Sequence, residues 1–412
     1  MRKDKREVNS SKTYVWRLGL MVLIGLTGLT GCSDDSEEGR GQRVTIEAQS
    51  CAVGYAEETG TRGTGATRSD PQSPTWAPGY YLYNNLNSPF AGRKDLMGKS
   101  IGVFFAQNGS AAPEEGTFFY SEYDDDGTWH LSNTEISSGD YFLYGFIPTE
   151  DADHATISST DYSNGAVLTI HDLDAVTPSD VCVIIGAKDG TASDVVTGLQ
   201  AGSFNTRLKP MGTSASTGDN NFIFLLFDHL YSALRFNFLV DAEYAKLRTI
   251  KLRQLELVAY SDDSGGAVKA KYNVTISLQK TTDGSSPITG VTFTPDLSSG
   301  NVAPVSLYDW ENEPARYLTL SDTEPTSFMG SFVPGNLLFF KLRSTYDVYD
   351  RQGNLIRERC QAENTFDLRT KFGSYTSATR GHSYSYTITV QPTYIYVLSE
   401  PDLDNPTMVI SN

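Results

Sequence analysis

From residue 43 onward, apolar and polar side chains alternate along the chain. The pattern begins in "RVTIEAQ", where Val44, Ile46 and Ala48 share one face. Alternation or continuous apolar runs return in "SIGVFFAQ", "YFLYGFIP", "AVLTIHDL", "VCVIIGAK", "FIFLLFDHLYSALRFNFLV", "IKLRQLELVAY", "YNVTISL", "LLFFKLRSTYDVY" and "YSYTITV". These segments are rich in β-branched and aromatic residues and are bounded by Gly, Pro, Asp, Asn or Ser, which predicts strands. The sequence therefore predicts an all-β protein.

Interruptions of the pattern predict how the strands are grouped. The polar stretch at 209–221 separates two groups, each large enough for a β-sandwich of about 150 residues. We therefore expect one sandwich at 43–215, a second at 220–391 and a C-terminal tail at 392–412. The apolar phase slips by one between Leu252 and Leu255, which predicts a β-bulge. The segment "LFDHLYSALRF" allows one helical turn.

The first 31 residues have the pattern of a signal peptide. A basic stretch precedes the apolar segment Leu18–Leu29, which is too short for a stable membrane anchor. It ends in "LTGC", the lipobox of a bacterial lipoprotein, so cleavage before Cys32 and lipidation (including palmitate) of its thiol are expected. The alternative is an ordinary signal peptide followed by a coincidental cysteine.

The negative charge of the chain argues against nucleic acid and anionic membranes as partners. The chain carries a net charge of −17, and residues 1–31 contribute six basic and two acidic side chains, so the remainder carries −17 − 4 = −21. Such a surface repels nucleic acid and anionic membranes, and we expect neither as a partner. The acidic run "SDDSEE" at 33–38 predicts a solvated tether.

Two arginines stand in an unusual setting. Arg62 and Arg68 lie in "EETGTRGTGATRSD", a run of Gly, Thr and Ala that no fold would keep rigid. A trypsin-like protease would reach them easily, although exposed arginines also occur in ordinary loops. Residues 32–70 are thus expected to hold the tether, a first strand and a processing loop.

The sequence contains no recognisable catalytic or metal-binding motif. None of the five histidines forms a pair at metal-ligand spacing, and His229 has the apolar surroundings of a structural histidine. Cys51, Cys182 and Cys360 lack CxxC spacing and allow at most one disulfide. We expect no catalytic residue, metal or cofactor, and we do not expect an enzyme. Asp126-Gly127 and "RQGNL" at 351–355 predict hairpin turns.

The order of segments resembles one known family. "VTIEA", an Arg-containing "TRG" loop, "MGKSIGVFF", "YDDDGTWHL", "GDYFLYGFIP" and "FLLFDHLYSALRFNF" follow one another as in the fimbrillin-like pilins of type V pili. The resemblance covers most of the chain after the signal peptide. It implies two transthyretin-like β-sandwich domains in tandem and a subunit of a cell-surface fimbrium that supports adhesion and biofilm formation. It also implies that the acidic run directs export to the outer membrane.

Donor-strand exchange would explain the arginines. Cleavage after Arg62 or Arg68 would release the strand of Val44, Ile46 and Ala48 together with the lipid, and the vacated groove would accept a strand from another subunit. The expected partners are other fimbrial subunits, a trypsin-like maturation protease and, before processing, the outer membrane.

The C-terminal tail carries two alternatives. Pro392 should end the closing strand of the second sandwich because proline lacks a ladder donor. Beyond it, the apolar residues keep period two and predict a donor strand: Tyr394, Tyr396, Leu398, Met408 and Ile410. Packing of the tail on its own domain is the other explanation.

A surface glycan-binding lipoprotein of β-sandwich design is the competing function. That function would need exposed aromatic residues as a sugar platform, for which Trp76, Trp129 and Trp310 are the candidates.

Overall fold

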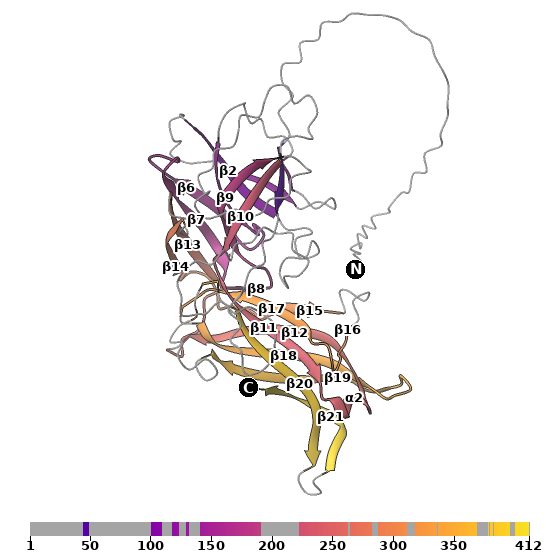
Figure 1. Ribbon diagram of the computed structural model, residues 1–412. Coiled ribbons are helices and arrows are strands. Elements are labelled where there is room, and N and C mark those ends of the chain that lie inside the picture. The colour runs from indigo at the N-terminus through magenta and orange to yellow at the C-terminus, as the bar shows by residue number, and fades with distance from the viewer. Residues whose placement is uncertain are drawn as a thin grey trace, which may run out of the picture. The chain divides into compact units, whose positions relative to one another are not determined.

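The computed structural model shows an all-β protein, as predicted (Figure 1). It describes residues 44–48, 100–108, 118–122, 129–131, 141–190, 222–262, 264–281, 287–310, 318–335, 337–368, 378, 380–381, 383–395 and 400–411. Within these ranges the strands form four sheets, and the helix is the single turn α2 (Ala242–Ala245). None of the described helical segments has the length and apolar character needed to cross a membrane.

The first sandwich combines a seven-stranded and a four-stranded sheet. The larger sheet has the order β3 (Phe119–Glu122), β2 (Ser100–Gln107), β5 (Tyr141–Ile147), β9 (Cys182–Gly190), β10 (Phe222–His229), β1 (Val44–Ala48) and β4 (Trp129–Leu131). The smaller has the order β14 (Ile288–Pro295), β13 (Lys271–Gln279), β7 (Gly165–Asp174) and β6 (His154–Ser158). Buried rings join the two layers: Phe104 of β2 packs on Tyr162 in the β6–β7 loop, with ring centroids 5.1 Å apart.

The second sandwich combines two five-stranded sheets. One has the order β21 (Glu400–Ser411), β20 (Ser383–Ile395), β11 (Ser232–Val240), β17 (Thr326–Phe332) and β8 (Val176–Thr177). The other has the order β15 (Val305–Asp309), β12 (Thr249–Asp262), β18 (Leu337–Tyr349) and β19 (Leu355–Asp367), with β16 (Leu318–Thr319) also paired to β12. Aromatic contacts connect the two sheets, such as Phe332 with Phe340 at 4.8 Å between centroids.

The strand pairing departs from the predicted division near residue 215. β10 lies after the polar stretch but pairs with β9, so that stretch links two antiparallel neighbours of one sheet. β13 and β14 also belong to the first sandwich, because β13 pairs with β7. Conversely, β8 lies before the polar stretch but pairs with β17 of the second sandwich. The strands on either side of the polar stretch therefore belong to one sheet, where a domain boundary had been expected.

Of the local features predicted from the sequence, the bulge and one turn are confirmed and the helical turn is wrong. The register of β12 against β18 shifts between Leu252 and Gln254, which confirms the bulge. The turn at 351–355 is confirmed, with Gly353 at φ +82°, a conformation that favours glycine. The helical turn in "LFDHLYSALRF" is wrong, because β10 and β11 occupy that segment. Asp126-Gly127 lies outside the described residues.

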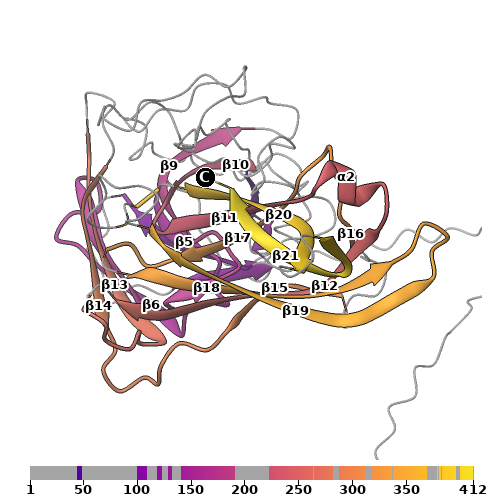
Figure 2. The same ribbon diagram turned by 90° about the horizontal axis from the view of Figure 1, so that it is seen from below.

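Pro392 does not end its strand. β20 continues to Ile395, and Pro392 is paired with Pro406 of β21 at a point where the register then shifts. Two prolines facing each other remove two ladder donors at one place, and a register irregularity accommodates the loss. The hairpin of β20 and β21 is drawn in yellow in Figure 2.

Candidate functional site

The first strand, β1, occupies an interior position of the seven-stranded sheet. Thr45–Ala48 pair in parallel with Phe222–Leu225 of β10, and Val44–Ile46 pair antiparallel with β4. Among the described strands of this sheet, β1 is the hydrogen-bonded neighbour of β4. Loss of β1 would therefore expose backbone N–H and C=O groups of β10 and remove the strand with which β4 pairs.

The backbone pairing of β1 is short for an interior strand. It is five residues long, and parallel pairing is slightly less stable per residue than antiparallel pairing. Val44, Ile46 and Ala48, predicted from the sequence as the displaced strand, all lie within it. The predicted processing residues Arg62 and Arg68 and the lipidation residue Cys32 lie outside the described residues.

The C-terminal tail forms the other terminal strand. Tyr394 belongs to β20 and is paired with Pro401, whereas Met408 and Ile410 of β21 are paired with Val390 and Ile388. Tyr396 and Leu398 lie outside the described residues. β21 stands at the end of its sheet, with β20 as its neighbour.

Side chains from several elements bind the backbone of β21. The phenol of Tyr244 in α2 donates to the carbonyl of Leu403 at 2.8 Å. The phenol of Tyr346 in β18 donates to the carbonyl of Pro406 at 2.9 Å. From β19, the amide of Asn364 donates to the carbonyl of Met408 at 3.0 Å. The tail is thus packed on its own domain, the second of the two alternatives.

Burial accompanies these bonds. Met408 is buried in the core of the second sandwich. Desolvation raises the pKa of Tyr346 to about 12, and burial also raises the pKa of Tyr244 well above its ordinary value. Both phenols therefore remain protonated donors at neutral pH.

The proposed aromatic platform has little support among the described residues. Trp310 is partly buried, and the guanidinium of Arg253 lies 4.8 Å from its ring centroid. Trp129 lies in β4, and Trp76 falls outside the described residues. A surface hollow lies between the β6–β7 and β13–β14 segments, lined by residues that include Asp161, Asn164 and Gln279, but no aromatic side chain is among its described lining.

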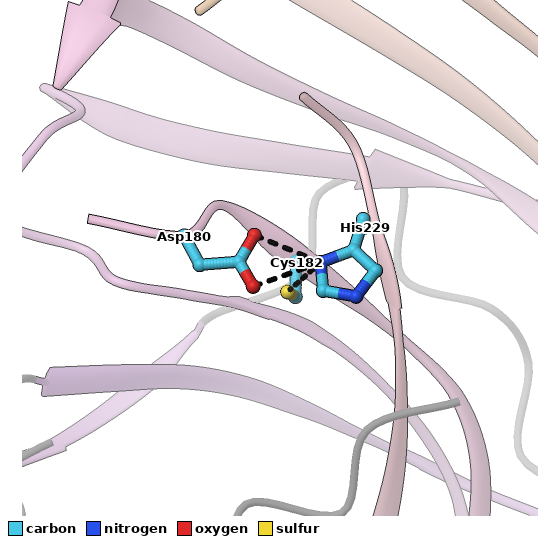
Figure 3. A group of neighbouring side chains, drawn as sticks. All are labelled: Asp180, Cys182 and His229. Carbon is cyan, nitrogen blue, oxygen red and sulfur yellow. Dashed lines mark hydrogen bonds and ion pairs between the residues drawn. The ribbon is translucent and has the colours of Figure 1, made fainter. Parts of the chain in front are cut away.

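A buried polar cluster lies where β9 begins and β10 ends (Figure 3). Nδ1 of His229 is 2.8 Å from each carboxylate oxygen of Asp180 and 3.6 Å from Sγ of Cys182. Cys182 and His229 are direct cross-strand partners. Asp180 precedes Cys182 by two residues, and this spacing in extended chain places both side chains on one side.

Neighbouring contacts fix the position of His229. The amide of Leu230 donates to the carbonyl of Val181 at 2.8 Å, and Nη1 of Arg380 donates to the carbonyl of His229 at 2.7 Å. Arg380 also forms an ion pair with Asp228 at 2.9 Å. Burial is the larger influence on the pKa of Asp228 and raises it, while the positive charge of Arg380 opposes the rise.

No sequence motif joins these three residues. Metal-ligand motifs join residues at short spacings, whereas His229 lies 47 residues from Cys182 along the chain. The sequence indicates only that Asp180 and Cys182, two residues apart before an apolar run, share one side of the chain. The register of β9 against β10 places His229 beside them. Cys182 and Cys360 are both buried in the described structure.

Comparisons with known proteins give distant likenesses. No family model matches the chain, and no curated protein matches it. A solved structure named for cell adhesion from Bacteroides fragilis has 13% identity and a TM-score of 0.37, and the match covers 90% of this chain and 97% of that one. A fimbrial protein from Bacteroides vulgatus has 11% identity and a TM-score of 0.26, with 76% and 91% covered.

A third likeness is to the fimbrial anchor protein Mfa2 from Porphyromonas gingivalis. It has 10% identity and a TM-score of 0.23, and the match covers 76% of this chain and 88% of that one. The similar structures thus carry names from cell adhesion and fimbriae. Superpositions this loose carry no argument about function, which must rest on the residues of the chain itself.

Proposed function

We propose that the chain is a structural subunit of a cell-surface fimbrium, exported as a lipoprotein and polymerised by donor-strand exchange. The observation that carries the proposal is the place of β1 in its sheet. The short strand β1, which precedes Arg62 and Arg68 in the sequence, lies between β10 and β4, and its departure would leave an open slot in the sheet. Such a slot accepts an extended segment through main-chain hydrogen bonds.

In this proposal a single cleavage removes both the lipid and the strand β1. Lipidation at Cys32 holds the precursor at the outer membrane, and cleavage after Arg62 or Arg68 by a trypsin-like protease removes Cys32 and β1 together. A head-to-tail contact in the vacated slot does not close on itself, so subunits continue as a filament. The filament then supports adhesion and biofilm formation.

The tail would act as the donor only after leaving its own sheet. Tyr394, Tyr396, Leu398, Met408 and Ile410 keep the alternation that a donor needs. Met408, however, is buried, and three buried or partly buried side chains bind the backbone of β21. Donation by this segment therefore requires these contacts to be replaced in the neighbouring subunit.

The double variant Arg62→Ala/Arg68→Ala tests the proposal. We expect a longer precursor on the cell surface, no assembly of this subunit into filaments by electron microscopy, and retention of Cys32 by N-terminal sequencing. Arg351→Ala, which changes an exposed arginine in the β18–β19 turn, is the matched control and should mature normally. Filaments containing the uncleaved double variant would overturn the proposal.

A further inference from the structure

Two side chains of types that can ligate metals, Asp180 and Cys182, lie close to Nδ1 of His229 in the first sandwich. The carboxylate of Asp180 lies 2.8 Å from it and the thiol sulfur of Cys182 lies 3.6 Å from it. The three ligand atoms all lie within 4.8 Å of one another. An imidazole nitrogen offers either one hydrogen or one lone pair, and here a carboxylate and a sulfur face the same nitrogen.

The arrangement does not fit nucleophilic catalysis. A histidine that activates a thiol uses one ring nitrogen for the nucleophile and the other for the orienting carboxylate. Here Asp180 and Cys182 both lie near Nδ1 of His229. The carboxylate therefore contacts the same nitrogen that would have to receive the thiol proton. Cys182 is also fully buried, which withholds it from a substrate.

We propose that Asp180, Cys182 and His229 bind a zinc ion. Thiolate, imidazole and carboxylate are the ligands that zinc takes in proteins, with bond lengths of about 2.3, 2.0 and 2.1 Å. Two such ligands on a tetrahedral ion lie about 3.3–3.6 Å apart, so the sulfur–nitrogen distance already fits. The carboxylate has to withdraw from Nδ1 by about 0.5 Å to meet the same geometry.

Charge and burial favour the same ion. A thiolate and a carboxylate together carry two negative charges, which a divalent cation neutralises, and neutral clusters are far less costly to bury than isolated charges. The side chains of His229 and Asp180 are only 4% and 8% exposed. The ion therefore enters while the chain folds, since β9 and β10 close around it.

Its place in the sheet gives the ion a mechanical role. β1 pairs with β10 at Phe222–Leu225, and His229 lies at the opposite end of β10. A metal bond between β9 and β10 at that end holds β10 in the sheet whether or not β1 is present. The site thus anchors the strand whose other end would border the slot.

Metal analysis of purified protein tests the site. We expect about one zinc per chain after expression in zinc-supplemented medium and extensive dialysis, and a loss of at least tenfold in Cys182→Ser. Cys360→Ser, a buried cysteine of the second sandwich, is the matched control and should retain the metal. Asp180→Asn keeps the shape of the side chain and should also bind less zinc, which guards against misfolding of the cysteine variant.

Cobalt gives a direct view of the ligands. Protein refolded with Co²⁺ in place of zinc should show a thiolate-to-cobalt charge-transfer band that is absent from Cys182→Ser and present in Cys360→Ser. The proposal is overturned if folded wild-type protein holds no zinc after expression and after refolding with zinc. It is equally overturned if Cys182→Ser keeps the metal and the band.

Discussion

The two terminal strands of the described chain, β1 and β21, are attached to their sheets in opposite ways. β1 lies inside its sheet but has five residues and parallel pairing to β10. β21 lies at the end of its sheet but has twelve residues and receives hydrogen bonds from α2, β18 and β19. Position in a sheet alone therefore does not measure how extensively a strand is paired, because strand length and pairing direction differ as well.

Deleting residues 400–412 should produce the largest effect. The deletion removes buried Met408 and leaves the donors of Tyr244, Tyr346 and Asn364 without their acceptors. Burial of one such side chain contributes about 2 kcal/mol and each hydrogen bond about 1 kcal/mol, so we expect a loss on the order of 5 kcal/mol. Urea unfolding followed by circular dichroism measures it. An unchanged midpoint would mean that the tail is a free donor strand.

Removing β1 should have a smaller effect on stability. A chain that starts at residue 69 should remain folded, with faster amide hydrogen exchange at Phe222–Leu225 of β10, whose partner is lost. Exchange in β11 and β20 of the second sandwich should not change. Unfolding of the first sandwich in this truncated chain would contradict the view that β1 is the removable strand.

Alkaline pH should weaken the attachment of β21 in particular. Tyr346 has an ordinary pKa of 10.0 that rises to about 12 in the folded protein. Between these values the folded chain keeps a proton that the unfolded chain releases, so its contribution to stability is complete below pH 10 and is lost as pH rises toward 12. Urea midpoints across this range should fall less steeply in Tyr346→Phe than in the wild-type protein.

The single substitution Tyr346→Phe should have the smallest effect. It keeps the buried ring but removes the donor to the carbonyl of Pro406, at a cost of about 1–2 kcal/mol. Tyr260→Phe is the control, since Tyr260 is 39% exposed and should change stability by less than about 0.5 kcal/mol. Equal changes in stability for the two substitutions would mean that the hydrogen bond of Tyr346 does not help to hold the tail.

Strands were predictable because their signal is local. Alternation located β1 and β20, and the phase slip before Leu255 located the bulge of β12. Pairing was less predictable, since no local signal shows that β13 returns to β7 across more than 90 residues of chain. The same limit hid the Asp180, Cys182 and His229 cluster, which exists only through the register of β9 against β10.

The return of β13 to β7 also determines when the first sandwich can be finished. Leu168 and Ile170 of β7 pair with Ile276 and Val274 of β13, and all four are buried. A chain that emerges from its N-terminus first has made all of β11 and β12 before β13 becomes available to cover β7. The second sandwich is then already begun, so the two halves must reach completion together. A fragment ending near residue 215 would leave this apolar face open and be prone to aggregation.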